Sequence, residues 1–183
     1  MKVDLSKYNN DWYKKEIGAG KTKQVIWYFI NILFIQSRWI PSSAVKRFWL
    51  KRFGAKIGEG VIIKPGVSVK YPWKLQIGNH VWIGENVWID NLDDVEIGNN
   101  ACISQGAMLL CGNHNYKSET FDLMIGKIVL KEGAWVGAQS VVCPGVTLHE
   151  YSLLTVNSVA TKDLEANGIY SGNPAVFKRK RNS

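Results

Sequence analysis

Aliphatic residues recur at every sixth position over most of the chain, starting at Ile57. A glycine usually follows the aliphatic residue, and a small or β-branched residue comes four positions after it, as in IGEGV at 57–61. Further sets begin at Ile77 and Ile97. A period of six fits neither an amphipathic helix, with a period of about 3.6, nor a half-buried strand, with a period of about 2. The pattern therefore indicates a repeat architecture.

Three six-residue units make one triangular coil, with a short strand on each side and the aliphatic side chains turned inward. Successive sets lie 20 residues apart at first, which is one coil of eighteen plus two extra residues at a corner. Glycine after the aliphatic residue suits a tight corner because it has no Cβ. The repeat ends at Ala160 and predicts five coils, each about 4.8 Å tall. We expect an all-β solenoid, a parallel β-helix.

Large apolar residues at helical spacing precede the repeat, in VIWYFINILFI at 25–35 and VKRFWLKRFG at 45–54. An uncapped stack of coils would expose strand edges. We therefore expect the N-terminal extension, residues 1–56, to place a helical cap over the first coil.

The apolar run 25–35 is about half as long as a membrane-spanning helix. Lys21, Lys23 and Arg38 surround it. The segment 25–40 is therefore also a candidate for peripheral contact with an anionic membrane surface.

One interruption of the repeat is long enough to carry chemistry. The fourth set starts 33 residues after the third, which leaves an excursion of 15 beyond one coil. Solenoids accept insertions at corners, and loops on a rigid scaffold often carry function. This insertion, CGNHNYKSETFDLMIG at 111–126, contains His114. Neutral imidazole suits removal of a hydroxyl proton around neutral pH. His114 is the candidate catalytic base, whereas His80 and His149 occupy ordinary repeat positions and are expected at the surface.

Composition narrows the classes of partner. The 183-residue chain has a formal charge of +8, which favours anionic partners, but it contains no recognised nucleic-acid-binding motif. Cys102, Cys111 and Cys143 lack Cys-x-x-Cys spacing, so neither a disulfide framework nor a thiolate zinc site is supported. Reduced cysteines and the absence of a visible signal peptide favour the cytoplasm.

From Ile57 to Arg179 the repeats resemble the hexapeptide-repeat acyltransferases, which include galactoside, maltose, serine and virginiamycin acetyltransferases. The segments 53–78 and 109–118 are similar to the subgroup assigned to colanic acid biosynthesis or polysaccharide O-acetylation. The resemblance implies a left-handed β-helix, although general connection rules favour right-handed crossovers. It also implies acetyl transfer from acetyl-CoA to a sugar hydroxyl in surface polysaccharide biosynthesis. The enzyme would be a homotrimer with active sites between subunits.

The resemblance also implies roles for particular residues. His114 lies 17 residues after Ile97, as the family motif requires of the catalytic base. Where galactoside enzymes have an acceptor-binding Asn, this chain has Gly84, which puts the acceptor contacts in doubt. The acceptor candidates are Asn86, Asp90 and Asn91. Each of them could equally be a corner residue that satisfies its own backbone.

Coenzyme A is expected along the last coils, on the stretches 135–148 and 156–163. Gly137 and Ala138 would let the thioester approach closely, and Trp135 would contribute to substrate binding as a wall of the cleft near His114. Cations are needed for the phosphates. The candidate cofactor-binding residues are Gly137, Ala138, Val156, Thr161, Lys162 and Arg179.

These expectations divide the chain into a cap at 1–56, a catalytic β-helix at 57–165 and a basic tail at 166–183. The alternatives are an N-acetyltransferase of an amino sugar, a non-catalytic β-helical scaffold and a γ-type carbonic anhydrase. The last binds zinc through three histidines, two of them five residues apart. The three histidines here lie more than thirty residues apart, so no metal site is expected.

Overall fold

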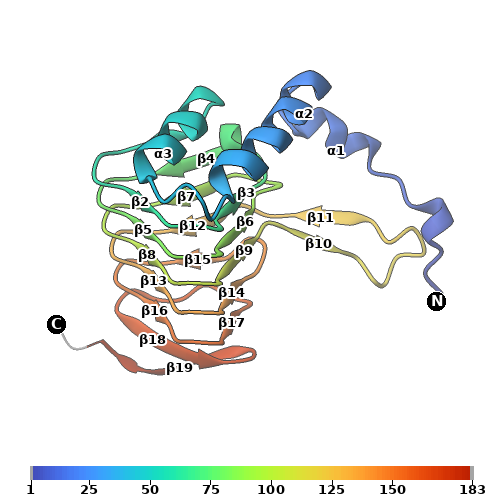
Figure 1. Ribbon diagram of the computed structural model, residues 1–183. Helices are drawn as coiled ribbons and strands as arrows, with labels where there is room; N and C mark the ends of the chain where they lie inside the picture. Colours follow the sequence, from blue (N-terminus) through green and yellow to red (C-terminus); the bar gives the residue numbers. More distant parts are fainter. Residues whose placement is uncertain (1, 182–183) are drawn as a thin grey trace.

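The computed structural model describes residues 2–181 and contains the triangular column that the repeat predicts (Figure 1). Each coil adds one short strand to each of three parallel sheets, here called the first, second and third face in chain order. The corner that follows each face carries the same number. The first face consists of β1 (Lys56–Ile57), β4 (Leu75–Ile77), β7 (Val95–Ile97), β12 (Ile128–Leu130) and β15 (Thr147–Leu148). The second face consists of β2 (Ile62–Ile63), β5 (Trp82–Ile83), β8 (Cys102–Ile103), β13 (Trp135–Val136), β16 (Leu153–Leu154) and β18 (Gly168–Gly172). The third face consists of β3 (Ser68–Val69), β6 (Trp88–Asp90), β9 (Met108–Leu110), β14 (Val141–Val142) and β17 (Val159–Ala160).

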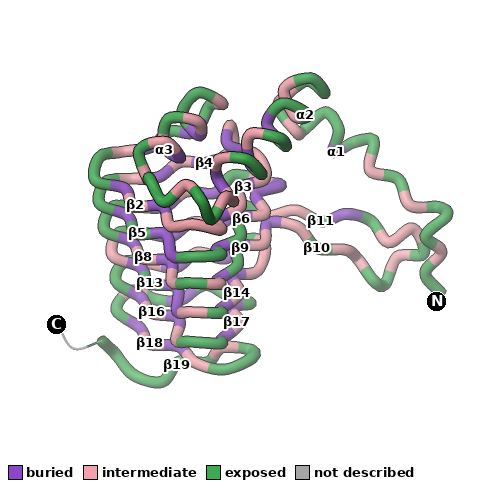
Figure 2. Tube along the Cα trace, in the orientation of Figure 1, coloured by how far each residue is buried: buried purple, intermediate pink, exposed green. Residues whose placement is uncertain are grey.

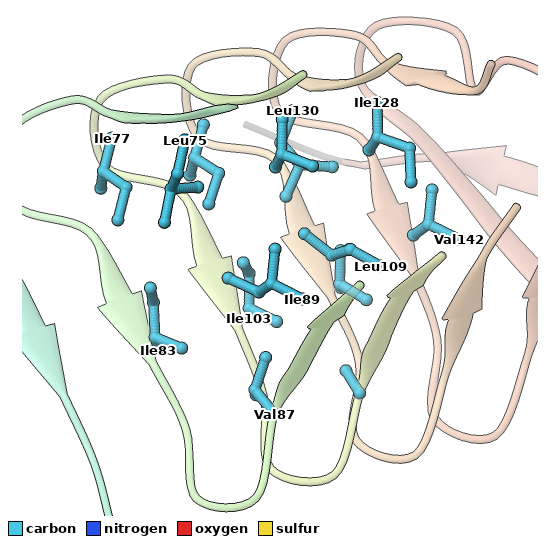
Figure 3. Packing of buried hydrophobic residues seen from close by; sticks show 14 of the residues in the cluster. Leu75, Ile77, Ile83, Val87, Ile89, Ile103, Leu109, Ile128, Leu130 and Val142 are labelled. Atoms are coloured by element: carbon cyan, nitrogen blue, oxygen red, sulfur yellow. The ribbon is translucent and has the colours of Figure 1, made fainter. Parts of the chain in front are cut away.

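Strand register stacks the repeat's aliphatic residues directly above one another. On the first face Ile57 pairs with Ile77, Ile77 with Ile97, and Ile97 with Leu130. The side chains from all three faces meet inside the column, where they fill its length (Figure 3). A slip of one residue would turn these side chains outward, so the hydrophobic repeat itself specifies the register.

The glycines that follow the aliphatic residues have a different role from the predicted one. A Cβ on Gly137 would lie 2.6 Å from the backbone nitrogen of Val156 in the next coil, and one on Gly84 would lie 2.6 Å from that of Gln105. The left-handed residues of these corners come two positions later, at Asn86 and Gln139. Close stacking of coils, and not a tight corner, therefore excludes a side chain at the glycine.

The N-terminal region covers the open end of the first coil, as predicted. Its elements are the 3-10 turn η1 (Leu5–Lys7), helices α1 (Asp11–Glu16) and α2 (Lys21–Ile30), the π-helical turn η2 (Asn31–Ile35) and helix α3 (Ser43–Arg52). Trp27 of α2 donates its Nε1 hydrogen to the Val69 carbonyl at 2.9 Å. Ser43 Oγ of α3 accepts from the backbone nitrogen of Ile63 at 3.0 Å. The cap thus pairs polar groups of the exposed strand edge. None of the helices in residues 2–181 combines the length and apolar character needed to cross a bilayer.

The opposite end of the column is closed by a hairpin that the sequence did not predict. Strand β18 continues the second face below β16, and β19 (Ala175–Lys180) returns antiparallel to β18. Leu164 forms a single parallel bridge with Leu148, so a partial sixth coil follows the five predicted ones. The segment expected to be a basic tail is therefore largely paired, although Lys178, Arg179 and Lys180 remain exposed.

Candidate active site

The insertion at 111–126 forms a two-stranded arm that projects from the third corner (Figure 1). Strand β10 (Gly112–His114) pairs antiparallel with β11 (Leu123–Ile125), and His114 lies opposite Leu123. The arm leaves the column after β9 and rejoins it at β12. The predicted loop is thus an ordered hairpin, which holds His114 away from the column.

The imidazole of His114 is held on three sides by the arm and the N-terminal segment. Its Nδ1 lies 2.9 Å from the carbonyl oxygen of Phe121. The ring stacks on the Phe121 ring with a centroid distance of 4.4 Å and an angle of 2°. Tyr8 approaches edge-on at 5.5 Å. A carbonyl oxygen can only accept, so this contact requires the hydrogen on Nδ1 and leaves the lone pair on Nε2.

The tip of the arm is a hydrogen-bonded turn centred on Asp122. Its carboxylate accepts from Ser118 Oγ at 2.7 Å and from Thr120 Oγ1 at 2.6 Å. These two bonds hold the pKa of Asp122 below its ordinary value, so the carboxylate stays ionised around neutral pH. Phe121 lies between Thr120 and Asp122 in the chain and has a left-handed backbone φ of 50°. The turn therefore sets the direction of the Phe121 carbonyl that binds His114.

Replacing Asp122 with asparagine is expected to lower kcat about tenfold, because an amide cannot accept from both hydroxyls with the same strength and Phe121 loses its support. KM for acetyl-CoA and the melting temperature should change little, because Asp122 is exposed on the arm. Steady-state kinetics would check the split between kcat and KM. The control is Lys117→Ala, which removes an exposed side chain from the same tip. Unchanged kcat in the Asp122 variant would show that the turn does not position the imidazole.

The N-terminal segment contacts the arm and joins it to the cap. The repeat pattern did not predict this contact. Asp4 donates its backbone N–H to the Glu119 carbonyl at 2.8 Å, and Lys7 forms an ion pair with the Glu119 side chain. Tyr13 donates its hydroxyl to the Leu92 carbonyl at 2.7 Å. Figure 1 shows this segment running beside the tip of the arm. Two regions far apart in sequence thus fix the surroundings of His114.

A groove of about 430 Å³ runs along the second corner of the last three complete coils. Its lining is Ser104, Gln105, Trp135, Gly137, Ala138, Leu153, Thr155 and Val156. Trp135 forms one wall and donates its Nε1 hydrogen to Ser104 Oγ at 2.9 Å. The structure therefore brings together four residues predicted to lie near the cofactor, namely Trp135, Gly137, Ala138 and Val156.

Within one chain, this groove and the arm lie at different corners. His114 projects from the third corner, whereas the groove lies at the second. The other predicted cofactor residues are also divided. Thr161 and Lys162 are exposed at the third corner after β17, and Arg179 lies in β19 opposite Ile169, at the edge of the second face. A single column therefore does not place Trp135 beside His114.

The three acceptor candidates have different surroundings. Asn86 is exposed at the second corner, where its Oδ1 lies 3.4 Å from Arg38. Asp90 forms an ion pair with Lys70 at 3.0 Å and lines a cleft of about 340 Å³ between α2 and the third face. Both side chains have atoms that a ligand could reach.

The structure corrects the prediction that Asn91 binds the acceptor. Its side chain is fully buried, its Oδ1 accepts from the Tyr71 nitrogen at 2.9 Å, and its Nδ2 donates to the Tyr71 carbonyl at 2.6 Å. It clamps one coil to the previous one and presents no surface to an acceptor. Asn91 is thus a structural corner residue, although the backbone groups that it satisfies belong to the preceding coil and not to its own corner.

The cysteines do not offer a nucleophile. Cys102, Cys111 and Cys143 are unpaired, and burial raises the pKa of each thiol, to about 12 for Cys111. Only a thiolate attacks readily, so Cys111 stays inert although it lies at the base of the arm. Within residues 2–181, no group of three or more His, Cys, Asp and Glu side chains is arranged to hold a metal ion.

Comparison with known proteins identifies the family. The chain is 35% identical over 166 residues to the proposed colanic acid biosynthesis acetyltransferase WcaF of Escherichia coli K12, with 90% of both chains covered. It is 30% identical over 151 residues to the galactoside O-acetyltransferase of the same strain, covering 78% of this chain and 72% of that protein. The chain belongs to the hexapeptide-repeat acetyltransferases. No protein-family model matches it.

Solved structures agree on the fold of this acetyltransferase. A hexapeptide-repeat acetyltransferase of Vibrio cholerae, solved in complex with acetyl-coenzyme A, superposes with a TM-score of 0.82 at 19% identity. The alignment covers 98% of this chain and 96% of that one. The left-handed β-helix that the resemblance implied is confirmed by these neighbours.

Proposed function

We propose that this acetyltransferase moves the acetyl group of acetyl-CoA to a hydroxyl of a sugar, with His114 as the general base. The bond between His114 Nδ1 and the Phe121 carbonyl carries the proposal, because it selects the tautomer with a free lone pair on Nε2. A neutral imidazole in that form can remove the hydroxyl proton while the oxygen attacks the acetyl carbon. Acetyl-CoA supplies the activated acetyl group, and the proton finally reaches the departing thiolate.

The transfer is proposed to be direct, without an acetylated enzyme. The raised pKa of Cys111 argues against an acetyl-cysteine, although this thiol is the nearest along the chain to His114. The role left for the protein is to position the hydroxyl, the imidazole and the thioester together.

The groove at the second corner is the proposed site of the pantetheine arm. Its mainly apolar lining suits the methylenes of the pantetheine chain, and the Vibrio relative was solved with acetyl-coenzyme A. Lys162 and Arg179 are exposed cations available for the phosphates, and Thr161 is a neighbouring hydroxyl donor.

A homotrimer is proposed because one column separates the base from the groove. The arm of one subunit at its third corner would meet the second corner of a neighbour, and three such contacts close a ring. Each active site would then combine His114 from one subunit with Trp135, Gly137 and Ala138 from the next. This arrangement also encloses both substrates better than one convex face can.

The acceptor is proposed to be a hydroxyl of a surface polysaccharide precursor. Two of the similar curated relatives are named for colanic acid biosynthesis and for galactoside acetylation. Asn86 and Asp90 are the proposed acceptor-binding residues, since Asn86 is exposed and Asp90 lines the cleft beside the third face. We propose that the reaction takes place in the cytoplasm, where the three unpaired cysteines would stay reduced.

An acceptor panel tests this proposal. The purified protein should release coenzyme A thiol from acetyl-CoA when it is given galactosides, hexoses or nucleotide sugars, and mass spectrometry should detect an acetylated sugar. Alkali should release acetate from the product, because O-acetyl esters hydrolyse and N-acetyl amides resist. An alkali-stable product formed only with amino sugars would contradict O-acetylation and would show that the enzyme is an N-acetyltransferase. No thiol release with any acceptor, together with no binding of coenzyme A, would indicate a scaffold.

A further inference from the structure

Helix α2 and the turn η2 are apolar on the side that faces away from the column. Their inner face packs on the first coil through Trp27, Asn31 and Ile35, which are buried. Six large apolar residues on the outer side are exposed, namely Val25, Ile26, Tyr28, Phe29, Ile32 and Leu33. A helix on the surface of a globular protein usually turns polar residues outward. Figure 2 shows the exposed stretch along α2.

The chain after η2 extends this exposed apolar surface. Trp39 is 94% exposed and follows Arg38, which is exposed as well. The six outer residues and Trp39 are called the apolar platform below. Contiguous apolar surfaces of this kind mark interaction sites. The combination of aliphatic, aromatic and cationic side chains is typical of segments that lie in a membrane interface.

The positive charge of the protein lies in the same region. Residues 1–56 contain twelve Lys and Arg against three Asp and Glu, a net charge of +9. Residues 57–183 contain eleven Lys and Arg against twelve Asp and Glu, a net charge of −1. Lys46 is buried in the cap, whereas Lys14, Lys15, Lys21, Lys51 and Arg52 are exposed. The whole excess of positive charge therefore lies in the N-terminal region that carries the apolar platform.

We propose that the apolar platform docks this protein on an anionic lipid bilayer, with α2 and η2 lying in the plane of the interface. The fifteen residues Lys21–Ile35 would reach roughly 22 Å as a helix, which is shorter than the hydrocarbon core of about 30 Å. Insertion is therefore shallow and reversible. Phe29, Leu33 and Trp39 enter the boundary between headgroups and acyl chains, and the surrounding lysines and arginines attract anionic headgroups.

The charge also argues against a second copy of the chain as the occupant. Cap-to-cap contact would bring two regions of +9 together, and their repulsion opposes association at low salt. An anionic bilayer satisfies both the apolar surface and the charge. Bilayer docking would hold the enzyme where lipid-linked sugar precursors are exposed, which is an extension of the proposed function and is not needed for the docking itself.

Vesicle sedimentation tests the docking without using acetyl transfer. The full-length protein should sediment with vesicles of phosphatidylcholine and phosphatidylglycerol in a 7:3 ratio. Binding to phosphatidylcholine alone should be at least about tenfold weaker, and 0.5 M salt should reduce the anionic binding. The double variant Phe29→Ser/Leu33→Ser should lose about tenfold or more of the partition coefficient, because both side chains point outward.

The matched control removes two exposed apolar side chains away from both the cap and the arm, in Tyr151→Ser/Val176→Ser. This control should sediment like the unaltered protein, and both double variants should keep their melting temperature and turnover on a soluble acceptor. Equal binding by the Phe29/Leu33 variant, or no binding by the unaltered protein, overturns the proposal. So does a change of oligomeric state in that variant by light scattering with vesicle binding unchanged, which would assign the apolar platform to a protein interface.

Discussion

Replacing His114 with alanine is expected to lower turnover by about 10²–10⁴-fold, the range that a positioned general base contributes. The loss should appear in kcat, because removing the imidazole leaves the acceptor hydroxyl with no group to take its proton. Affinity for coenzyme A should stay within a few-fold, since the groove at the second corner does not include this residue. Thiol release under saturating acetyl-CoA measures the first quantity, and calorimetric titration with coenzyme A measures the second.

His149→Ala is the matched control for the His114 variant. His149 is partly exposed at the first corner, where it follows β15, and its removal should leave turnover unchanged. Melting temperatures of both variants should stay close to that of the parent, because the column holds its core without either imidazole. Normal turnover in His114→Ala would remove this residue from the mechanism and leave the family assignment intact.

Two inactive variants should restore activity when their chains assemble together. His114→Ala lacks the base, and Ala138→Trp fills the groove with an indole. If each site combines the arm of one subunit with the groove of the next, mixed trimers contain sites built from two intact halves. Random assembly at equal expression makes about one quarter of all sites fully intact. Co-expressed chains should therefore show about a quarter of the parent turnover, although each variant alone is nearly inactive.

Different affinity tags on the two chains make this complementation decisive. Sequential purification on both tags selects mixed assemblies, and light scattering gives their subunit number. A mixed trimer without activity above that of either variant would mean that base and groove act within one chain. A mass other than three subunits would contradict the proposed ring. Each residue altered in one chain is unaltered in the other. The melting temperature and subunit number of each variant purified alone check that it folds and assembles.

The repeat determined most of the column because its physics is local. Each coil contacts only the coils above and below it, so six-residue spacing in the sequence translates directly into strand length, inward side and coil number. The position of the insertion followed from the same counting, and with it the location of His114. The need to cover a strand edge likewise predicted a cap from the apolar residues that precede the first coil.

The predictions that missed concern contacts between segments far apart in the chain. The sequence suggested that Asn91 is an accessible polar residue. In the structure its side-chain amide bonds to the backbone of Tyr71 in the preceding coil. The glycines after the aliphatic residues proved to serve stacking between coils. The hairpin at the C-terminus depends on where β18 ends the second face, which periodicity does not encode.

The sequence by itself determined a stack of triangular coils with one long insertion that bears a histidine. It did so because every coil of the repeat packs the same kinds of side chain against its two neighbours. Only the tertiary structure decided the state of that histidine. The Phe121 carbonyl selects its tautomer, and Tyr8 reaches it from the far end of the chain. The tertiary structure also showed a groove at the second corner, because a groove depends on how the side chains of successive coils stack, which residue spacing does not specify.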